Sequence, residues 1–264
     1  MSPPIYVTGA KGYAGTYLTR ALIAQGHTVH RLRLFDKGKL VVLQHSDVEL
    51  DRQAVVIHLS EDSNAGSGIV YDEIRQIALE NAKILSGSVQ KLIYFSSVAV
   101  YDVSASSRHD ETSNYLSQDP YAQHKLQIEG GLDLTKDLIV RPSNLYCETV
   151  KADTILGDLV SSKYLSGEPT LRNPNIECDF IHMKFVSQFI DRAVRHDWHG
   201  IYNVSSGLFT SGHALISAIS NSMTLSCKPT PSPYDNRKFM DRMGRTQIPS
   251  IVDHILGGHE LCLA

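Results

Sequence analysis

The chain has 264 residues, 42% hydrophobic and 20% charged, as in ordinary soluble globular proteins. Its formal net charge of −3 gives no electrostatic indication of nucleic-acid binding, so we expect no nucleic-acid partner. It has no run of about 18 apolar residues to cross a bilayer and no signal-peptide pattern at its start. Its 4 cysteines match neither metal-ligand spacing nor a disulfide framework. We therefore expect a cytoplasmic protein with no membrane contact and no metal site.

The first half of the chain alternates short β-rich runs with helical stretches. Strands are predicted from apolar runs at 5–8, 28–34, 54–59, 91–95 and 137–141. Helices are predicted from apolar spacing at 16–25, 71–86 and 121–134. Alternating strands and helices form parallel sheets through right-handed crossovers. The pattern predicts an α/β fold with a doubly wound parallel sheet of the Rossmann type, trimmed between residues 35 and 52, where the segment is short.

The amino-acid composition of the chain changes after about residue 146, where prolines become frequent. A further helix is expected at 185–195 and a further strand at 201–204. The predicted division is a Rossmann domain of residues 1–146 plus about 185–205, and a small lobe of about 147–184 plus 206–264. Ligands of such sheets bind at the carboxyl ends of the strands, so this lobe would roof the cleft and bind substrate.

A glycine-rich turn joins the first predicted strand to the first helix. Gly9 permits the tight turn, Gly12 lets a pyrophosphate approach the backbone, and Gly15 lets the helix pack closely on the strand. The start of the helix then offers free N–H groups and a positive dipole end to phosphates. The turn, which includes Lys11 and Tyr13, therefore predicts a dinucleotide cofactor.

The end of the second predicted strand bears on which dinucleotide binds. An acidic residue about 20 positions beyond the turn usually binds the ribose 2′-hydroxyl of NAD, but here that position holds Arg33. A guanidinium binds a 2′-phosphate through paired hydrogen bonds, and Lys11 would add a second positive charge. We expect NADP(H). The alternative is NAD(H), with Arg33 facing solvent and Asp36 binding the ribose.

Three residues carry the predicted chemistry. Tyr121 and Lys125 lie four residues apart, on one face of a predicted helix. An ammonium beside a tyrosine favours the phenolate, so such a pair can exchange a proton near neutral pH. Ser97 follows a buried strand, where its hydroxyl can donate to a substrate carbonyl oxygen. Together with the glycine turn, and in this order, these residues predict a hydride-transfer enzyme.

These motifs resemble those of the extended short-chain dehydrogenases/reductases, also called NAD-dependent epimerase/dehydratases. The similar segments span nearly the whole chain, at 56–60, 96–101, 141–146, 179–182, 202–204 and 235–249. The resemblance implies cofactor contacts from Leu59, Ser60, Tyr121, Lys125, Pro142 and Asn144. It implies substrate contacts from Ser97, Val98 and Asn144. It also implies a nucleotide-activated sugar as the small-molecule substrate, and a homodimer built on helices 71–86 and 121–134.

Departures from the family pattern refine the expected reaction. Cys178 replaces an arginine that often touches the sugar-nucleotide phosphate, and we expect Arg172 or Arg237 to substitute for it. Val98 and Ala99 stand where dehydratases of the family tend to carry carboxylates, which argues against dehydration. An NADP-type site favours net reduction, so we predict a ketoreductase that uses Tyr121 as the acid. The alternatives are an NAD-retaining sugar epimerase and a cofactor-binding sensor without turnover.

Overall fold

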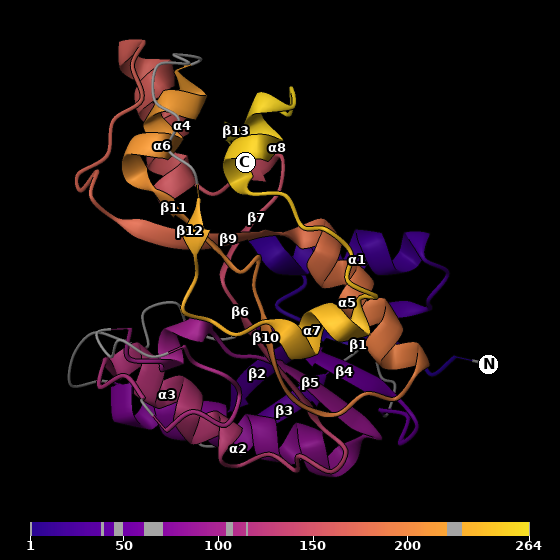
Figure 1. Ribbon diagram of the computed structural model, residues 1–264. Helices are drawn as coiled ribbons and strands as arrows, with labels where there is room; N and C mark the ends of the chain where they lie inside the picture. Colours follow the sequence, from indigo (N-terminus) through magenta and orange to yellow (C-terminus); the bar gives the residue numbers. More distant parts are fainter. Residues whose placement is uncertain are drawn as a thin grey trace.

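The computed structural model describes residues 2–263 except 38–39, 45–49, 61–70, 104–107, 115 and 221–228, and the side chains of 33–37, 40–44 and 71–74 are also outside the description. Figure 1 shows a central sheet with helices on both faces and a second group of elements beside it. Within the described ranges, no helix is both long and apolar enough to span a membrane.

The central sheet of the described chain has seven strands, in the order β10-β6-β5-β4-β1-β2-β3. Their bounds are Ile5–Thr8 (β1), Val29–Lys37 (β2), Leu40–Gln44 (β3), Val55–His58 (β4), Lys91–Phe95 (β5), Leu138–Pro142 (β6) and Gly200–Val204 (β10). All neighbouring strands pair in parallel except β2 and β3. The predicted Rossmann-type parallel sheet is therefore confirmed.

The edge of the sheet beyond β2 is an antiparallel hairpin. Strand β2 continues to Lys37, and β3 pairs back along it from Leu40, with Arg33 opposite Gln44. A parallel third strand needs a crossover of a dozen or more residues, usually a helix, and this short segment cannot supply one. The sheet is thus shortened between residues 35 and 52 as expected, and an antiparallel hairpin replaces a helix followed by a parallel strand.

Helices cover both faces of the central sheet in two layers (Figure 1), and side chains that alternate along each strand pack against one layer or the other. Val7 packs in the cluster that includes α1 and α5, whereas its neighbour Tyr6 packs in the cluster with α2 and α3. The helices are α1 (Tyr13–Ala24), α2 (Tyr71–Ser88), α3 (Pro120–Glu129), α5 (Met183–Arg195) and α7 (Arg237–Arg242). Because helices cover both faces of the sheet, the sequences of its strands are continuous apolar runs.

The second group of elements begins directly after the central sheet, because only Ser143 separates β6 from β7. One sheet has the order β12-β11-β9-β7, and another pairs β13 with β8. The strands are β7 (Asn144–Tyr146), β8 (Thr149–Val150), β9 (Glu177–His182), β11 (Leu208–Ser211), β12 (Thr230–Pro231) and β13 (Cys262–Leu263), and the helices are α4 (Ile155–Ser166), α6 (Gly212–Ile219) and α8 (Ile251–Leu256). The predicted division into two domains stays a prediction.

Helix α3 is shorter than the sequence pattern predicts. It begins at Pro120, where Asp119 caps the amides of Tyr121 and Ala122, but it ends at Glu129 instead of residue 134. Gly130 follows as the C-cap, and Gly131 comes next. Glycine is a poor helix former, and two in succession outweigh the apolar spacing beyond them. The helix is long enough to carry both Tyr121 and Lys125.

Candidate active site

The glycine turn forms a cradle that side chains would fill. Gly9 has φ +65°, and an added Cβ there would lie 2.9 Å from the carbonyl carbon of Leu59. An added Cβ on Gly15 would lie 2.2 Å from the carbonyl oxygen of Gly9. Gly12 is the N-cap of α1 and places no side chain over the first amides of the helix. This turn therefore fits a dinucleotide pyrophosphate at the start of α1.

Thr8 holds the edge of the cradle in place, a role that sequence reasoning missed. Its Oγ1 lies 2.8 Å from Nδ1 of His58 and accepts hydrogen bonds from the amides of Leu59 and Ser60 at 3.1 and 3.2 Å. The end of β4 is thereby tied to the end of β1. A buried threonine at a strand end resembles any core residue in the sequence, so no local signal marks it.

Ser97 lies just beyond β5, at the start of the short 3-10 helix η1 (Val98–Val100). Its Oγ accepts a hydrogen bond from the amide of Ala99 at 3.1 Å, which fixes the side chain at the N-cap. As an acceptor in this bond, the hydroxyl keeps its proton to donate elsewhere. Ser97 is half-buried at the carboxyl edge of the sheet, where a substrate oxygen can reach it.

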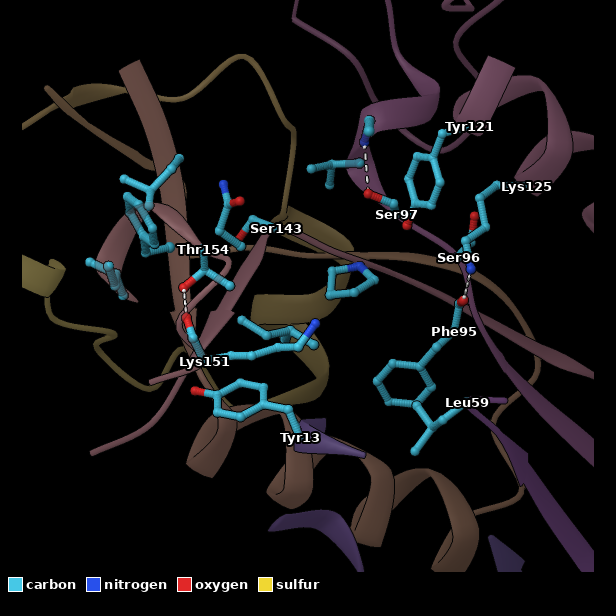
Figure 2. Close-up of a pocket in the computed structure, with 18 of the residues that line it drawn as sticks. Tyr13, Leu59, Phe95, Ser96, Ser97, Tyr121, Lys125, Ser143, Lys151 and Thr154 are labelled. Carbon is cyan, nitrogen blue, oxygen red and sulfur yellow. Dashed lines mark hydrogen bonds between the residues drawn. The ribbon is translucent and has the colours of Figure 1, made fainter. Parts of the chain in front are cut away.

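Tyr121 and Lys125 extend from α3 toward the same region (Figure 2). The Lys125 ammonium is buried and donates to the carbonyl oxygen of Phe95 at 2.9 Å. It lies 5.6 Å from the centre of the Tyr121 ring. The Tyr121 side chain is more accessible, with 37% of the residue exposed. The pair therefore combines a fixed positive charge with a phenol that a substrate can reach.

A cavity of about 540 Å³ joins these residues, a typical size for a small-molecule site. It brings together eight of the predicted residues: Tyr13, Leu59, Ser97, Val98, Tyr121, Lys125, Pro142 and Asn144. The amide of Cys147 donates to the Tyr13 hydroxyl at 2.8 Å, which fixes that ring at the wall. Burial raises the pKa of Tyr13, so the phenol stays neutral.

The structure does not bring the two predicted phosphate-binding arginines to this cavity. Arg237 has a side chain that is 77% exposed and pairs with Asp235, two residues before it. Arg172 is exposed and does not line the cavity. Lys11 is exposed in the glycine turn. The Arg33 side chain lies outside the described residues, so its predicted contact remains a prediction.

Lys151 and Thr154 line the cavity instead, and sequence reasoning missed both. Thr154 caps α4 by accepting from the amide of Gly157 at 3.1 Å, and it donates to the carbonyl oxygen of Lys151 at 2.7 Å. Figure 2 shows the Lys151 side chain extending into the cavity. Its ammonium donates to the exposed Asp153 at 2.6 Å. A threonine three residues before Gly157, ahead of an apolar run, was the available sequence signal for this helix start.

A buried polar network supports the floor of the site. Glu129 accepts hydrogen bonds from Ser96 Oγ and from Nε of Arg141, the latter at 3.0 Å. Arg141 Nη1 donates to the Tyr101 hydroxyl at 2.6 Å, which in turn donates to Asn203 at 2.8 Å. These groups link α3, β5, β6 and β10. Each is buried and paired, so the network fixes the helix that carries Tyr121 relative to the strand end that carries Ser97.

A model of the NAD dependent epimerase/dehydratase family matches residues 5–205, which is most of the chain. The chain belongs to this family. The UDP-glucose 4-epimerase of Halalkalibacterium halodurans is 28% identical over 146 residues, in a match that covers 47% of this chain and 44% of that protein. The match thus spans less than half the length of that curated relative.

Solved structures of other proteins show the same fold. The UDP-N-acetylglucosamine 4-epimerase from Methanobrevibacter ruminantium M1, in complex with UDP-N-acetylmuramic acid, has a TM-score of 0.72 and 19% identity, covering 97% of this chain and 96% of that chain. MoeE5, in complex with UDP-glucuronic acid and NAD, has a TM-score of 0.74 and 19% identity, covering 97% of both chains. At such identities these likenesses support the Rossmann-type fold alone.

Proposed function

We propose that this chain is an NAD(P)-dependent oxidoreductase that acts on a carbonyl or hydroxyl group of a nucleotide-activated sugar. The observation that carries the proposal is the cavity in which Ser97, Tyr121 and Lys125 meet beside the glycine cradle. A sensor without turnover would not need a buried ammonium aligned beside an accessible tyrosine. Family membership adds support for this class of reaction.

Each of the three side chains has a distinct proposed role. Ser97 donates a hydrogen bond to the reacting oxygen of the substrate, which polarises the carbonyl. Tyr121 transfers a proton to that oxygen in reduction and removes it in oxidation. Lys125, held by the Phe95 carbonyl, places a positive charge beside the Tyr121 ring. Tyr121 and Ser97 are the catalytic residues, and the buried network below them keeps their spacing.

The cradle of Gly9, Gly12 and Gly15 is the part of the chain that would hold the dinucleotide, with Tyr13 and Leu59 beside it. When bound, the nicotinamide cofactor supplies or accepts the hydride. We infer a preference for NADP(H) from Arg33, which directly follows Leu32, the residue of β2 that pairs with Thr8 at the end of β1. NAD(H) is the alternative, and NAD is the cofactor bound in the MoeE5 structure.

The lobe side of the cavity supports the proposed substrate class. Lys151 and the N-terminal turn of α4 face this space, and both favour an anionic group such as a phosphate. We propose that Lys151 contacts the diphosphate of a sugar nucleotide in place of the arginine that Cys178 replaces. Lys151→Gln should then raise KM for the sugar nucleotide and leave cofactor affinity unchanged.

Net reduction and epimerisation make different demands on the cofactor. A ketoreductase consumes NADPH stoichiometrically with product, whereas an epimerase oxidises and re-reduces one substrate and consumes none. The position of Arg33 favours reduction. Two similar proteins are described as 4-epimerases, which keeps epimerisation as the second candidate. Val98 and Ala99 beside Ser97 offer no carboxylate for dehydration.

The decisive experiment compares wild type with Tyr121→Phe. The enzyme is incubated with a UDP-keto-sugar and NADPH, and separately with UDP-glucose or UDP-N-acetylglucosamine and NAD. Loss of the proton donor should reduce turnover about 10²–10⁴-fold in whichever reaction the wild type catalyses. Tyr164→Phe, at an 85% exposed position on α4, is the matched control and should match wild type. Full activity in a folded Tyr121→Phe protein would refute the proposed mechanism, and binding without turnover would favour a sensor.

A further inference from the structure

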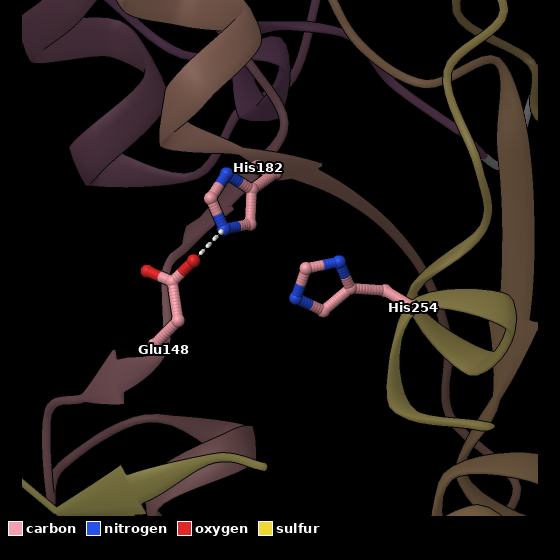
Figure 3. A group of neighbouring side chains, drawn as sticks. All are labelled: Glu148, His182 and His254. Carbon is pink, nitrogen blue, oxygen red and sulfur yellow. Dashed lines mark ion pairs between the residues drawn. The ribbon is translucent and has the colours of Figure 1, made fainter. Parts of the chain in front are cut away.

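Glu148, His182 and His254 meet beside the proposed active site, although they come from three separate segments. Glu148 lies between β7 and β8, His182 ends β9, and His254 lies in α8. One potential ligand atom from each residue lies within 4.8 Å of the other two. Figure 3 shows the carboxylate and the two imidazole rings turned toward a common space.

Two nitrogens in this group lack a hydrogen-bond partner within the described part of the chain. The Nε2 atoms of His182 and His254 are both buried and make no hydrogen bond there. The contact recorded for His182 Nε2 is the Glu148 carboxylate at 3.3 Å, an ion-pair distance. Buried polar atoms are rarely left unpaired in folded proteins, and such atoms often face a bound water or ion. The unpaired nitrogen of His254, the nitrogen of His182 that faces Glu148, and the carboxylate itself therefore converge on one space.

Packing against aromatic rings fixes the two imidazoles. Both lie nearly perpendicular to the Tyr146 ring, with centroid distances of 4.9 Å for His182 and 5.4 Å for His254. His254 also stacks with His259, with ring centroids 4.2 Å apart. This packing holds both rings in place.

We propose that Glu148, His182 and His254 bind a divalent transition metal ion of the zinc class. Two imidazoles and one carboxylate are a known zinc donor set, with a fourth position for water. Magnesium and calcium prefer oxygen ligands, so the two nitrogens select against them. The proposal is independent of the proposed oxidoreductase activity, because none of these residues lines the catalytic cavity.

Binding through His182 exchanges one hydrogen bond for a metal bond. The amide of Lys184 donates to Nδ1 of His182 at 3.0 Å, so the ring proton sits on Nε2 in the metal-free protein. When the metal occupies Nε2, this proton moves to Nδ1, and the Lys184 amide at the start of α5 loses its acceptor. One helix cap contributes far less free energy than a zinc site, so the exchange favours binding.

The ion would connect the C-terminal helix to a wall of the cavity. Cys147 precedes Glu148, and its amide holds the hydroxyl of Tyr13, which lines the cavity. His254 brings in α8, and β13 pairs with β8 directly after Glu148. A metal at this point would stabilise the segment from Cys147 to Val150 against both β9 and α8.

The experiment measures zinc binding by the full chain. Protein treated with EDTA and dialysed is titrated with zinc chloride by calorimetry, and thermal unfolding is recorded with and without zinc. The variants are Glu148→Gln and His254→Ala, and His199→Ala at an exposed histidine is the matched control. Cobalt chloride gives a second readout, because coordination by nitrogen changes its visible spectrum.

Wild type and His199→Ala should each bind one zinc ion per chain and melt at a higher temperature with zinc. Glu148→Gln and His254→Ala should bind zinc about tenfold more weakly or worse and lose this rise in Tm. The Glu148 side chain is 55% exposed, so Glu148→Gln tests the site even if His254→Ala fails to fold. Absence of zinc binding by wild type, or equal affinity in Glu148→Gln and wild type, would overturn the proposal.

Discussion

Replacement of Gly15 by alanine tests the cofactor cradle directly. The new Cβ would lie 2.2 Å from the Gly9 carbonyl oxygen and 2.8 Å from the Cα of Ala10, whereas ordinary contact begins near 3.4 Å. Both neighbours are backbone atoms, so α1 must move away from the turn by about 1 Å. Overpacking of this kind costs about 1–3 kcal/mol. For a chain of this size that corresponds to a fall in Tm of roughly 2–5 °C.

Cofactor affinity should fall together with stability, because the amides at the start of α1 move with the helix. A loss of about 1.4 kcal/mol in these contacts weakens binding about tenfold. The assay is calorimetric titration with NADPH and NADH, alongside thermal unfolding by circular dichroism. Gly87→Ala is the matched control, because it also lies in a helix and its added Cβ meets nothing within 4 Å. That variant should be stabilised by about 0.5–1 kcal/mol and bind cofactor normally. Wild-type Tm and affinity in Gly15→Ala would refute the close approach of helix and turn.

Further predictions concern the chemistry, the cofactor and the assembly. Lys125→Met should reduce turnover about 10²–10⁴-fold, as Tyr121→Phe does, and unchanged turnover would remove the ammonium from the mechanism. Ser97→Ala should cost less in the same assay if a water can donate in its place, and a loss larger than that of Tyr121→Phe would contradict this ranking. Arg33→Asp should reverse a preference for NADP(H) in calorimetric titration, and tighter NAD(H) binding by wild type would show that the Arg33 argument is wrong. Light scattering at micromolar concentration should give the mass of a dimer built on α2 and α3, whereas a monomer would exclude it.

Local sequence patterns predicted which segments of the chain form most strands and helices of the Rossmann sheet. Each of these elements depends on residues only a few positions apart. Apolar runs indicated the buried strands, and the glycine positions indicated the turn. The turn is a local feature because a Cβ at Gly15 would collide with Gly9 and Ala10 of the same turn. The spacing of Tyr121 and Lys125 was equally local. The end of α3 was missed because apolar spacing continues past Gly130, where glycine stops the helix.

Contacts between distant segments were decided only by the tertiary structure. Arg237 is a plausible phosphate ligand in sequence, but Asp235 pairs with it and it stays outside the cavity. Lys151 reaches the cavity because Thr154 starts α4 there, a position that no spacing from Ser97 could predict. The three side chains of the proposed metal site are far apart in the chain and form no ligand motif. They meet because β7 and β9 pair in parallel and α8 packs over them, and such long-range packing leaves no local period in a sequence.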